Sequence, residues 1–259
     1  MGAVGFDRFS RPIFDLTTLS TPSIVSQLDL LAKAGVVDGI STPNYNVAFD
    51  EALRAVTAPG TAPARPKLVI LVVGGPHDAA AYGSYRGGHM RLAFNGTARP
   101  WPVCVVQVGV GLIPQDVGRL RRIALDTGGQ HLQAATVGEL ADRVAQCRAG
   151  ALGQESPLAQ KVSLTRKARA LTVSLARRGT ATFLLGAPGV AKAAFTLQEP
   201  GGRVRTEAKP GPGAVFVRGD TYAFIRVSGA RKGKWTVKLT ASKRVQATFR
   251  VMAEAKPAT

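Results

Sequence analysis

The chain has 259 residues, of which 45% are hydrophobic and only 6% aromatic, so it can bury the core of one large domain or of two ordinary ones. The 29 glycines and 16 prolines are too many for an all-helical protein, and no apolar run approaches the roughly 18 residues of a membrane helix. A formal net charge of +18 excludes a neutral surface and favours an anionic partner.

The basic charge is concentrated in the second part of the chain. Residues 1–150 hold 14 Lys and Arg against 11 Asp and Glu, whereas residues 151–259 hold 20 against 5. This contrast predicts two domains, residues 1–150 and residues 151–259, with different surfaces.

Residues 1–150 alternate strand and helix patterns. A hairpin is expected over residues 3–17, and helices are expected after Thr21, after Asn44 or Asn46, over 115–126 and over 137–148. Residues 68–73 and 103–108 are apolar on both faces, which is typical of buried parallel strands, and residues 130–134 form a further short strand. This order predicts a doubly wound α/β domain with a mostly parallel sheet.

Residues 149–157 have the composition of a linker, and beyond them the helical period disappears. Eight short runs follow, several of them with period two, separated by Gly and Pro turns. They predict an all-β, immunoglobulin-like sandwich, with Trp235 and Phe249 on its inner face.

Several ordered segments of the first part resemble the von Willebrand factor type A domain. They are Val4–Ser10, the helix start Asn44-Tyr45-Asn46-Val47-Ala48, the strand Lys67–Gly75, the strand Pro102–Gly109, and the helix end Leu120–Gly129 with its Thr-Gly-Gly. The resemblance covers about 145 residues and implies a protein-interaction or adhesion module. The family's first strand has no counterpart, so an upstream segment or another chain is expected to supply it. The second part is similar to β-sandwich modules that follow such domains in extracellular bacterial proteins. The segments that carry this similarity are Ala181–Pro188, Leu197–Gly202 and Gly233–Val237.

The family's metal-binding residues are replaced in this sequence. The resemblance implies a hard cation held by an Asp-x-Ser-x-Ser loop, a threonine and an aspartate. Here the first motif is absent, Pro43 occupies the threonine position and Gly74 the aspartate position. Such a cation needs oxygen ligands, preferably anionic ones, so we expect no metal and no other cofactor.

Two groups of residues are candidate binding sites. The first is the loop edge of the type A domain, which is expected to bind a protein ligand through Thr42, Asn44, Asn46, His77 and Asp78. The second is the basic surface of the sandwich, which is expected to bind an anionic polymer or the cell envelope where turns converge; its candidates are Arg166, Lys167, Arg169, Arg231, Lys232 and Lys234. The alternative for the second group is a basic surface exposed only to solvent.

Catalytic motifs are missing from the sequence. There is no Gly-x-Ser-x-Gly elbow, and no Lys-Ser/Thr pair follows Gly74-Gly75, so we expect no enzyme activity. Cys104 and Cys147 are expected to be two buried thiols, with a disulfide as the alternative. No signal peptide is visible. The location stays open; an extracellular or cell-surface location is favoured weakly over the alternative of a cytoplasmic domain serving a chelatase-like ATPase.

Overall fold

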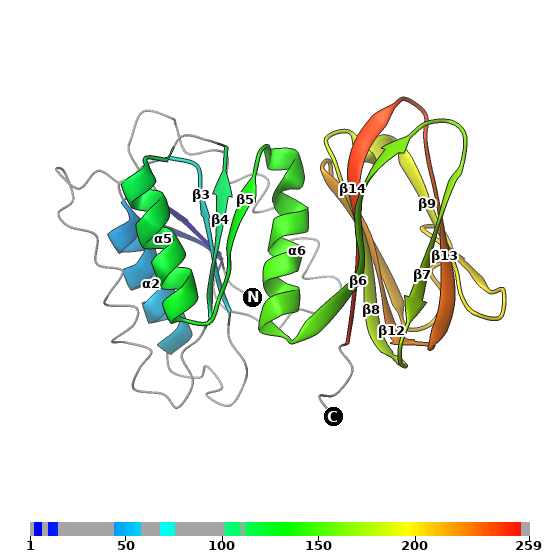
Figure 1. The fold of residues 1–259 in the computed structure, drawn as a ribbon, viewed down its shortest axis with the longest axis horizontal. Coiled ribbons are helices and arrows are strands. Elements are labelled where there is room, and N and C mark those ends of the chain that lie inside the picture. Colours follow the sequence, from blue (N-terminus) through cyan, green and yellow to red (C-terminus); the bar gives the residue numbers. More distant parts are fainter. Residues whose placement is uncertain are drawn as a thin grey trace. The chain divides into compact units, whose positions relative to one another are not determined.

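The computed structural model describes residues 3–6, 10–14, 44–57, 68–75, 102–109 and 112–254. The chain divides into two compact units, Met1–Leu132 and Gln133–Thr259, and each is described by itself (Figure 1). The helix expected after Thr21 and most of the glycine-rich stretch after Gly75 lie outside the described residues. No helix in the described ranges is long and apolar enough to cross a membrane.

The first unit contains the predicted parallel strands. β3 (Val69–Val73) pairs in parallel with β4 (Val103–Val108), and β5 (His131–Ala134) lies on the other side of β4. β1 (Ala3–Phe6) and β2 (Ser10–Phe14) form the predicted hairpin. Among the described strands of this sheet, β3 and β5 are the two edge strands.

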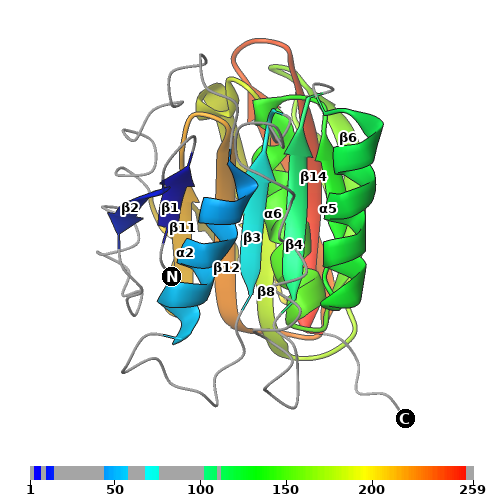
Figure 2. The ribbon, with the colours of Figure 1, turned by 90° about the vertical axis from the view of Figure 1, so that its left-hand side faces the viewer.

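Helices α2 (Tyr45–Thr57) and α5 (Pro114–Asp126) lie on the same face of β3 and β4 (Figure 2). Tyr45 and Phe49 of α2, and Leu120 and Ala124 of α5, share one apolar core with alternate residues of the two strands. The short side chains of β4 are buried along nearly its whole length, as the uninterrupted apolar run predicts.

The end of α5 explains the Thr-Gly-Gly sequence. The Thr127 hydroxyl donates to the Ile123 carbonyl at 2.8 Å, and the Val103 amide donates to the Thr127 hydroxyl at 3.0 Å. A Cβ on Gly129 would lie 2.1 Å from the Val103 carbonyl oxygen, so only glycine allows the chain to pass this close to β4. The predicted end of the helix is confirmed.

The second unit contains two antiparallel sheets with one common core. The five-stranded sheet has the order β11 (Ala214–Arg218), β12 (Tyr222–Ala230), β8 (Gly179–Gly186), β14 (Val245–Glu254), β6 (Gln154–Leu164). The four-stranded sheet has the order β10 (Val204–Thr206), β9 (Ala193–Gln198), β13 (Gly233–Ala241), β7 (Arg169–Leu175), and a short helix η2 (Val190–Lys192) precedes β9. Phe183 and Phe249 of one sheet contact Trp235 and Phe195 of the other, respectively, as the alternating pattern predicts. The two antiparallel sheets are observed; their immunoglobulin-like assignment stays a prediction.

The prediction of a linker at residues 149–157 is wrong. After η1 (Val137–Glu139), helix α6 (Leu140–Ala151) runs to Ala151, and β6 begins at Gln154 and pairs with Glu254 of β14. Ala149 of α6 packs with Leu184 and Met252, which point outward from the five-stranded sheet. The apolar outer face of that sheet needs a cover, which is why α6 belongs to the second compact unit rather than ending the first.

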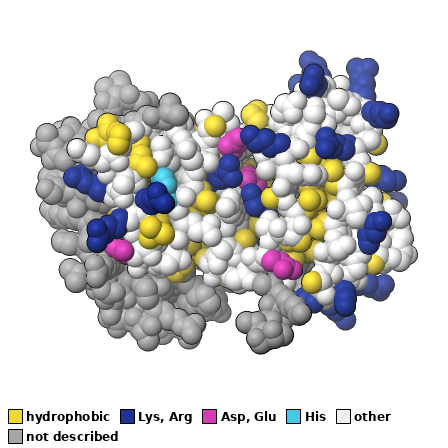
Figure 3. All heavy atoms as spheres, viewed as in Figure 1, with side chains coloured by type: hydrophobic (Ala, Val, Ile, Leu, Met, Phe, Trp, Pro, Cys, Tyr) yellow, Lys and Arg dark blue, Asp and Glu magenta, His cyan; other side chains and the backbone are white. Residues whose placement is uncertain are grey.

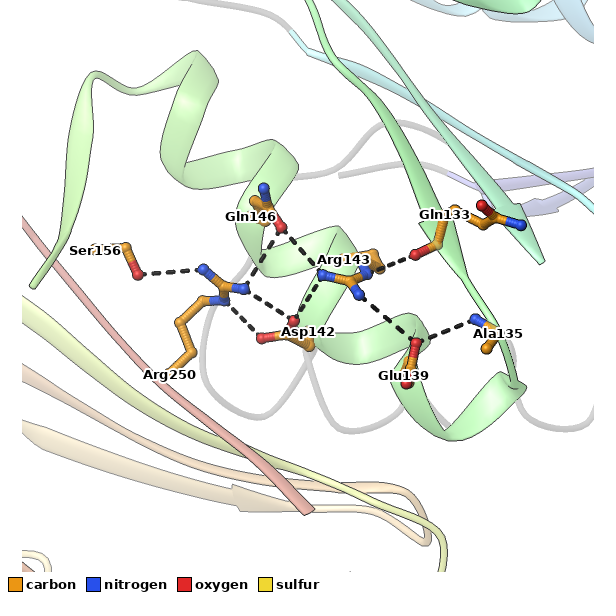
Figure 4. Close-up of polar contacts among 8 residues, drawn as sticks. All are labelled: Gln133, Ala135, Glu139, Asp142, Arg143, Gln146, Ser156 and Arg250. Carbon is orange, nitrogen blue, oxygen red and sulfur yellow. Dashed lines mark hydrogen bonds and ion pairs between the residues drawn. The ribbon is translucent and has the colours of Figure 1, made fainter. Parts of the chain in front are cut away.

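A buried ion pair fastens α6 to this sheet (Figure 4). Arg250 of β14 donates from Nε to Asp142 Oδ1 at 2.6 Å and from Nη2 to Asp142 Oδ2 at 3.0 Å. The same guanidinium donates to Ser156 Oγ at 3.2 Å. Arg143, the next residue of α6, approaches Asp142 Oδ2 at 3.4 Å and donates to the Gln133 carbonyl at 2.8 Å.

Candidate functional site

The loop edge of the first unit is the first candidate site. Here the carboxyl end of β3 meets the amino end of α2. Asn44 precedes α2, and its Oδ1 accepts from the Asn46 amide at 3.1 Å, so Asn44 rather than Asn46 caps this helix. Both asparagines are buried, whereas Thr42, His77 and Asp78 lie outside the described residues. The ligand-binding role of all five stays a prediction.

Two residues that are not among the five candidate binding residues help to build this edge. The buried Tyr45 hydroxyl donates to the carbonyl of Gly75, directly after β3. Burial, and secondly the charge of Asp116, raises the pKa of Tyr45, so its phenol remains a neutral donor at physiological pH. Asp116 itself is 2% exposed in the first turn of α5 and lies 3.8 Å from an Arg119 guanidinium nitrogen. The position of each residue at a helix start was the available sequence signal.

The chemistry of this edge is mostly neutral. Gly74 contributes no side chain after β3, and Gln107 near the end of β4 donates weakly to the Gly109 carbonyl at 3.5 Å. In the described ranges, no three His, Cys, Asp or Glu side chains are grouped so that they could hold a metal ion. The edge can therefore offer hydrogen bonds from neutral groups.

Ile113, the residue before α5, can supply an apolar contact at this edge. Its side chain is 49% exposed although it is a large aliphatic residue. The adjoining Pro114 and Gln115 are exposed as well. An exposed isoleucine between exposed neighbours at this edge is suited to contact with a protein surface.

The second candidate site is the basic surface of the second unit. All six predicted residues are exposed, and the structure corrects how they are grouped. Arg166, Lys167 and Arg169 lie where β7 begins, whereas Arg231, Lys232 and Lys234 lie where β13 begins. Because β13 pairs antiparallel with β7, with Gly233 opposite Leu175 and Leu239 opposite Arg169, the two groups lie at opposite ends of one strand pair. They do not converge at one set of turns.

Other cations extend the first group. The Arg166 Nε donates to the Ser242 carbonyl at 3.3 Å, which places Lys243 and Arg244 at the same end. Lys238 is exposed on β13 opposite Ala170, next to the first group, a position that the alternation of Trp235, Val237 and Leu239 with polar residues could have revealed.

The two cysteines are not free thiols. Cys104 and Cys147 are both buried and both disulfide-bonded, so the expectation of two buried thiols is wrong and the alternative holds. Helix and strand periodicity shows which side of an element a cysteine occupies, but it does not show what that side faces.

Comparisons with known proteins give weak structural likenesses only. No protein-family model and no curated protein matches the chain. A von Willebrand factor type A structure from Catenulispora acidiphila is 14% identical with a TM-score of 0.45, and the match covers 99% of this chain and 54% of that one. Proximal thread matrix protein 1 from the mussel byssus is 16% identical with a TM-score of 0.46, covering 63% of this chain and 37% of that one. A form of the mussel protein with a zinc-occupied MIDAS motif is 17% identical to this chain with a TM-score of 0.44. TM-scores below 0.5 do not establish a shared fold, so the family stays a proposal.

Proposed function

We propose that the chain is a non-catalytic protein-interaction or adhesion module of the von Willebrand factor type A kind that needs no metal ion. The observation that carries this proposal is the edge after β3, where Gly74 stands in place of a carboxylate and Tyr45 donates to the Gly75 carbonyl. In open α/β sheets, ligands bind outside the carboxyl ends of the strands, which is where these residues and Ile113 lie. A further strand beside β3, from an upstream segment or another chain, is part of the same proposal.

Metal independence is tested by titration calorimetry of the full chain with Mg²⁺, Ca²⁺ and Mn²⁺. A hard divalent cation prefers several anionic oxygens, and Asp116 is the one carboxylate among the described residues that build this edge. We expect no heat of binding in the micromolar range. Micromolar binding of any of the three ions would overturn this part of the proposal.

Protein binding at the edge is tested with two matched aliphatic substitutions on α5 and its N-cap. Ile113→Asp places a charge at the proposed contact, and Leu125→Asp places the same charge on a 65% exposed residue near the other end of the helix. Cross-linking and mass spectrometry of secreted and envelope fractions should recover a protein with the wild type and with Leu125→Asp, but not with Ile113→Asp. Equal recovery with both variants would place the contact elsewhere.

A second candidate function is binding of an anionic polymer or of the cell envelope through the second unit. Its specific support is the set of exposed cations along β7 and β13. The disulfide-bonded state of both cysteines supports an extracellular or cell-surface location, because disulfides persist in oxidising compartments. The full chain should bind heparin with affinity that falls steeply as salt rises. Absent or salt-insensitive binding would reject this candidate.

A further inference from the structure

One strand pair of the second unit, with its flanking turns, is rich in cationic residues and contains no acidic residue. Residues 165–178 and 230–244, which comprise β7, β13 and their flanking turns, contain eleven Lys and Arg and no Asp or Glu. Residues 151–259 contain 20 Lys and Arg in all. More than half of the cations of this part of the chain therefore belong to one edge pair of the four-stranded sheet.

The register of β13 determines which of these cations share a face. Trp235, Val237 and Leu239 point into the core, so Lys234 and Lys238 point to solvent. Lys238 lies opposite Ala170 and Lys234 opposite Ser174, and both β7 residues are exposed. The outer face of the strand pair thus carries Lys234 and Lys238. Arg169 lies opposite Leu239, on the other side of β7, but it is exposed at the first residue of the strand and so belongs with the turn residues at that end.

We call this surface the basic track, and its members are Lys167, Arg169, Arg231, Lys232, Lys234 and Lys238. In the part of the chain that the structure describes, none of the six forms an ion pair; the acidic residues Glu199, Glu207 and Glu254 pair instead with other arginines. Figure 3 shows Lys and Arg side chains following this side of the second unit from end to end. Because no acidic side chain pairs with these six cations, a bound external anion would reduce the repulsion among them.

The length of the track favours an extended ligand over a small one. β13 spans nine residues, and at about 3.4 Å per residue its two ends are about 27 Å apart. A small anion would meet only one end, whereas a linear polymer can contact the cations at both ends. Thr172 and Thr236 lie opposite one another on the same face, where their hydroxyls can bond to other hydroxyl groups.

The surface chemistry favours a polysaccharide over a nucleic acid. Bases of single strands need exposed aromatic rings on which to stack, and Trp235, the aromatic residue of this strand pair, is fully buried. The disulfide-bonded cysteines indicate an oxidising compartment, in which anionic polysaccharides are available ligands.

We propose that the basic track binds a linear anionic polysaccharide, carboxylated or sulfated, lying along β7 and β13. This inference rests on the second candidate function and adds the site and the ligand class. The probes are heparin fragments for sulfate, polygalacturonate for carboxylate, and duplex DNA as the competing polyanion.

The test compares two variants of the full chain that lose equal charge. The track variant combines Lys167→Gln, Arg169→Gln, Lys234→Gln and Lys238→Gln. The control variant combines Lys161→Gln, Arg203→Gln, Lys209→Gln and Arg226→Gln, which are exposed cations outside β7, β13 and their flanking turns. Because all eight side chains are exposed, both variants should keep the wild-type circular dichroism and melting temperature.

We expect the track variant to lose at least about tenfold in affinity for one of the two polysaccharides and to show a weaker salt dependence, while the control loses less than about threefold. Equal losses in both variants would overturn the track but leave polymer binding through diffuse charge. Tighter binding of duplex DNA than of either polysaccharide would overturn the ligand class. No binding of any probe by the wild type would overturn the second candidate function together with this inference.

Discussion

The buried pair between Asp142 and Arg250 allows a quantitative prediction about the second unit. Both side chains are at most 10% exposed, and two parallel hydrogen bonds join them. Asp142→Asn removes the negative charge and leaves the Arg250 guanidinium buried with the neutral oxygens of Ser156 and Gln146. Breaking such a pair from one side costs about 3–5 kcal/mol, so we expect a loss of that size in the free energy of unfolding.

The assay is urea unfolding followed by the fluorescence of Trp235, in a Trp101→Phe background so that the second unit alone is observed. Glu207→Gln is the matched control, because it removes a carboxylate from the partly exposed pair with Arg218 and should cost no more than about 1 kcal/mol. The double replacement Asp142→Leu with Arg250→Met should recover most of the stability, since no buried charge is left unpaired. A loss below about 1 kcal/mol for Asp142→Asn would show that water reaches the pair and would refute this reasoning.

Three further outcomes are expected from the structure. Alkylation of the unfolded chain should label neither Cys104 nor Cys147 until a reductant is added, and reduction should lower the stability by about 2–4 kcal/mol; labelling without reductant would contradict the disulfide-bonded state. Burial, and secondly the charge of Arg121, lowers the pKa of His131 in the folded chain, so its contribution to stability is present above about pH 6.5 and is lost as the pH falls through the folded pKa. Urea midpoints measured across this range should fall more steeply for the wild type than for His131→Gln, and parallel curves would refute the assignment. Trp235→Ala should cost about 3–5 kcal/mol by circular dichroism melting, because its indole fills the common core and donates to the Arg231 carbonyl; a cost near zero would be inconsistent with that burial.

Elements with a strong local pattern could be predicted from the sequence. The apolar run of β4 and the Thr127-Gly128-Gly129 end of α5 were found within a residue or two, because burial on both faces and a helix stop both leave local marks. The alternation around Trp235 likewise placed β13. The three-residue β10 was missed, since so short a strand carries no measurable period.

What could not be predicted depends on partners far away along the chain. The period of α6 predicts a helix, but its assignment to the first domain followed only from chain order, whereas the structure packs it against β14 through Asp142 and Arg250. These residues are 108 positions apart, and nothing local distinguishes Asp142 from a solvated helix acid. In the candidate site the same holds for Tyr45, whose partner Gly75 lies in another segment.

The distribution of charge decides between a functional basic surface and the general composition of a basic chain. A uniformly basic composition would scatter cations over both sheets of the second unit. Instead, Glu199 and Glu207 pair with arginines outside β7 and β13, while these two strands and their flanking turns contain eleven cations and no acidic residue. Among the ion pairs of the described residues, Arg177 is the one member of the eleven with an acidic partner, Glu254. The sequence located six of these residues, but it placed them in converging turns because strand pairing was unknown. Once β13 is paired with β7, the same residues form a line rather than a cluster, and a line of charge is better suited to an extended polymer than to a single phosphate or sulfate ion.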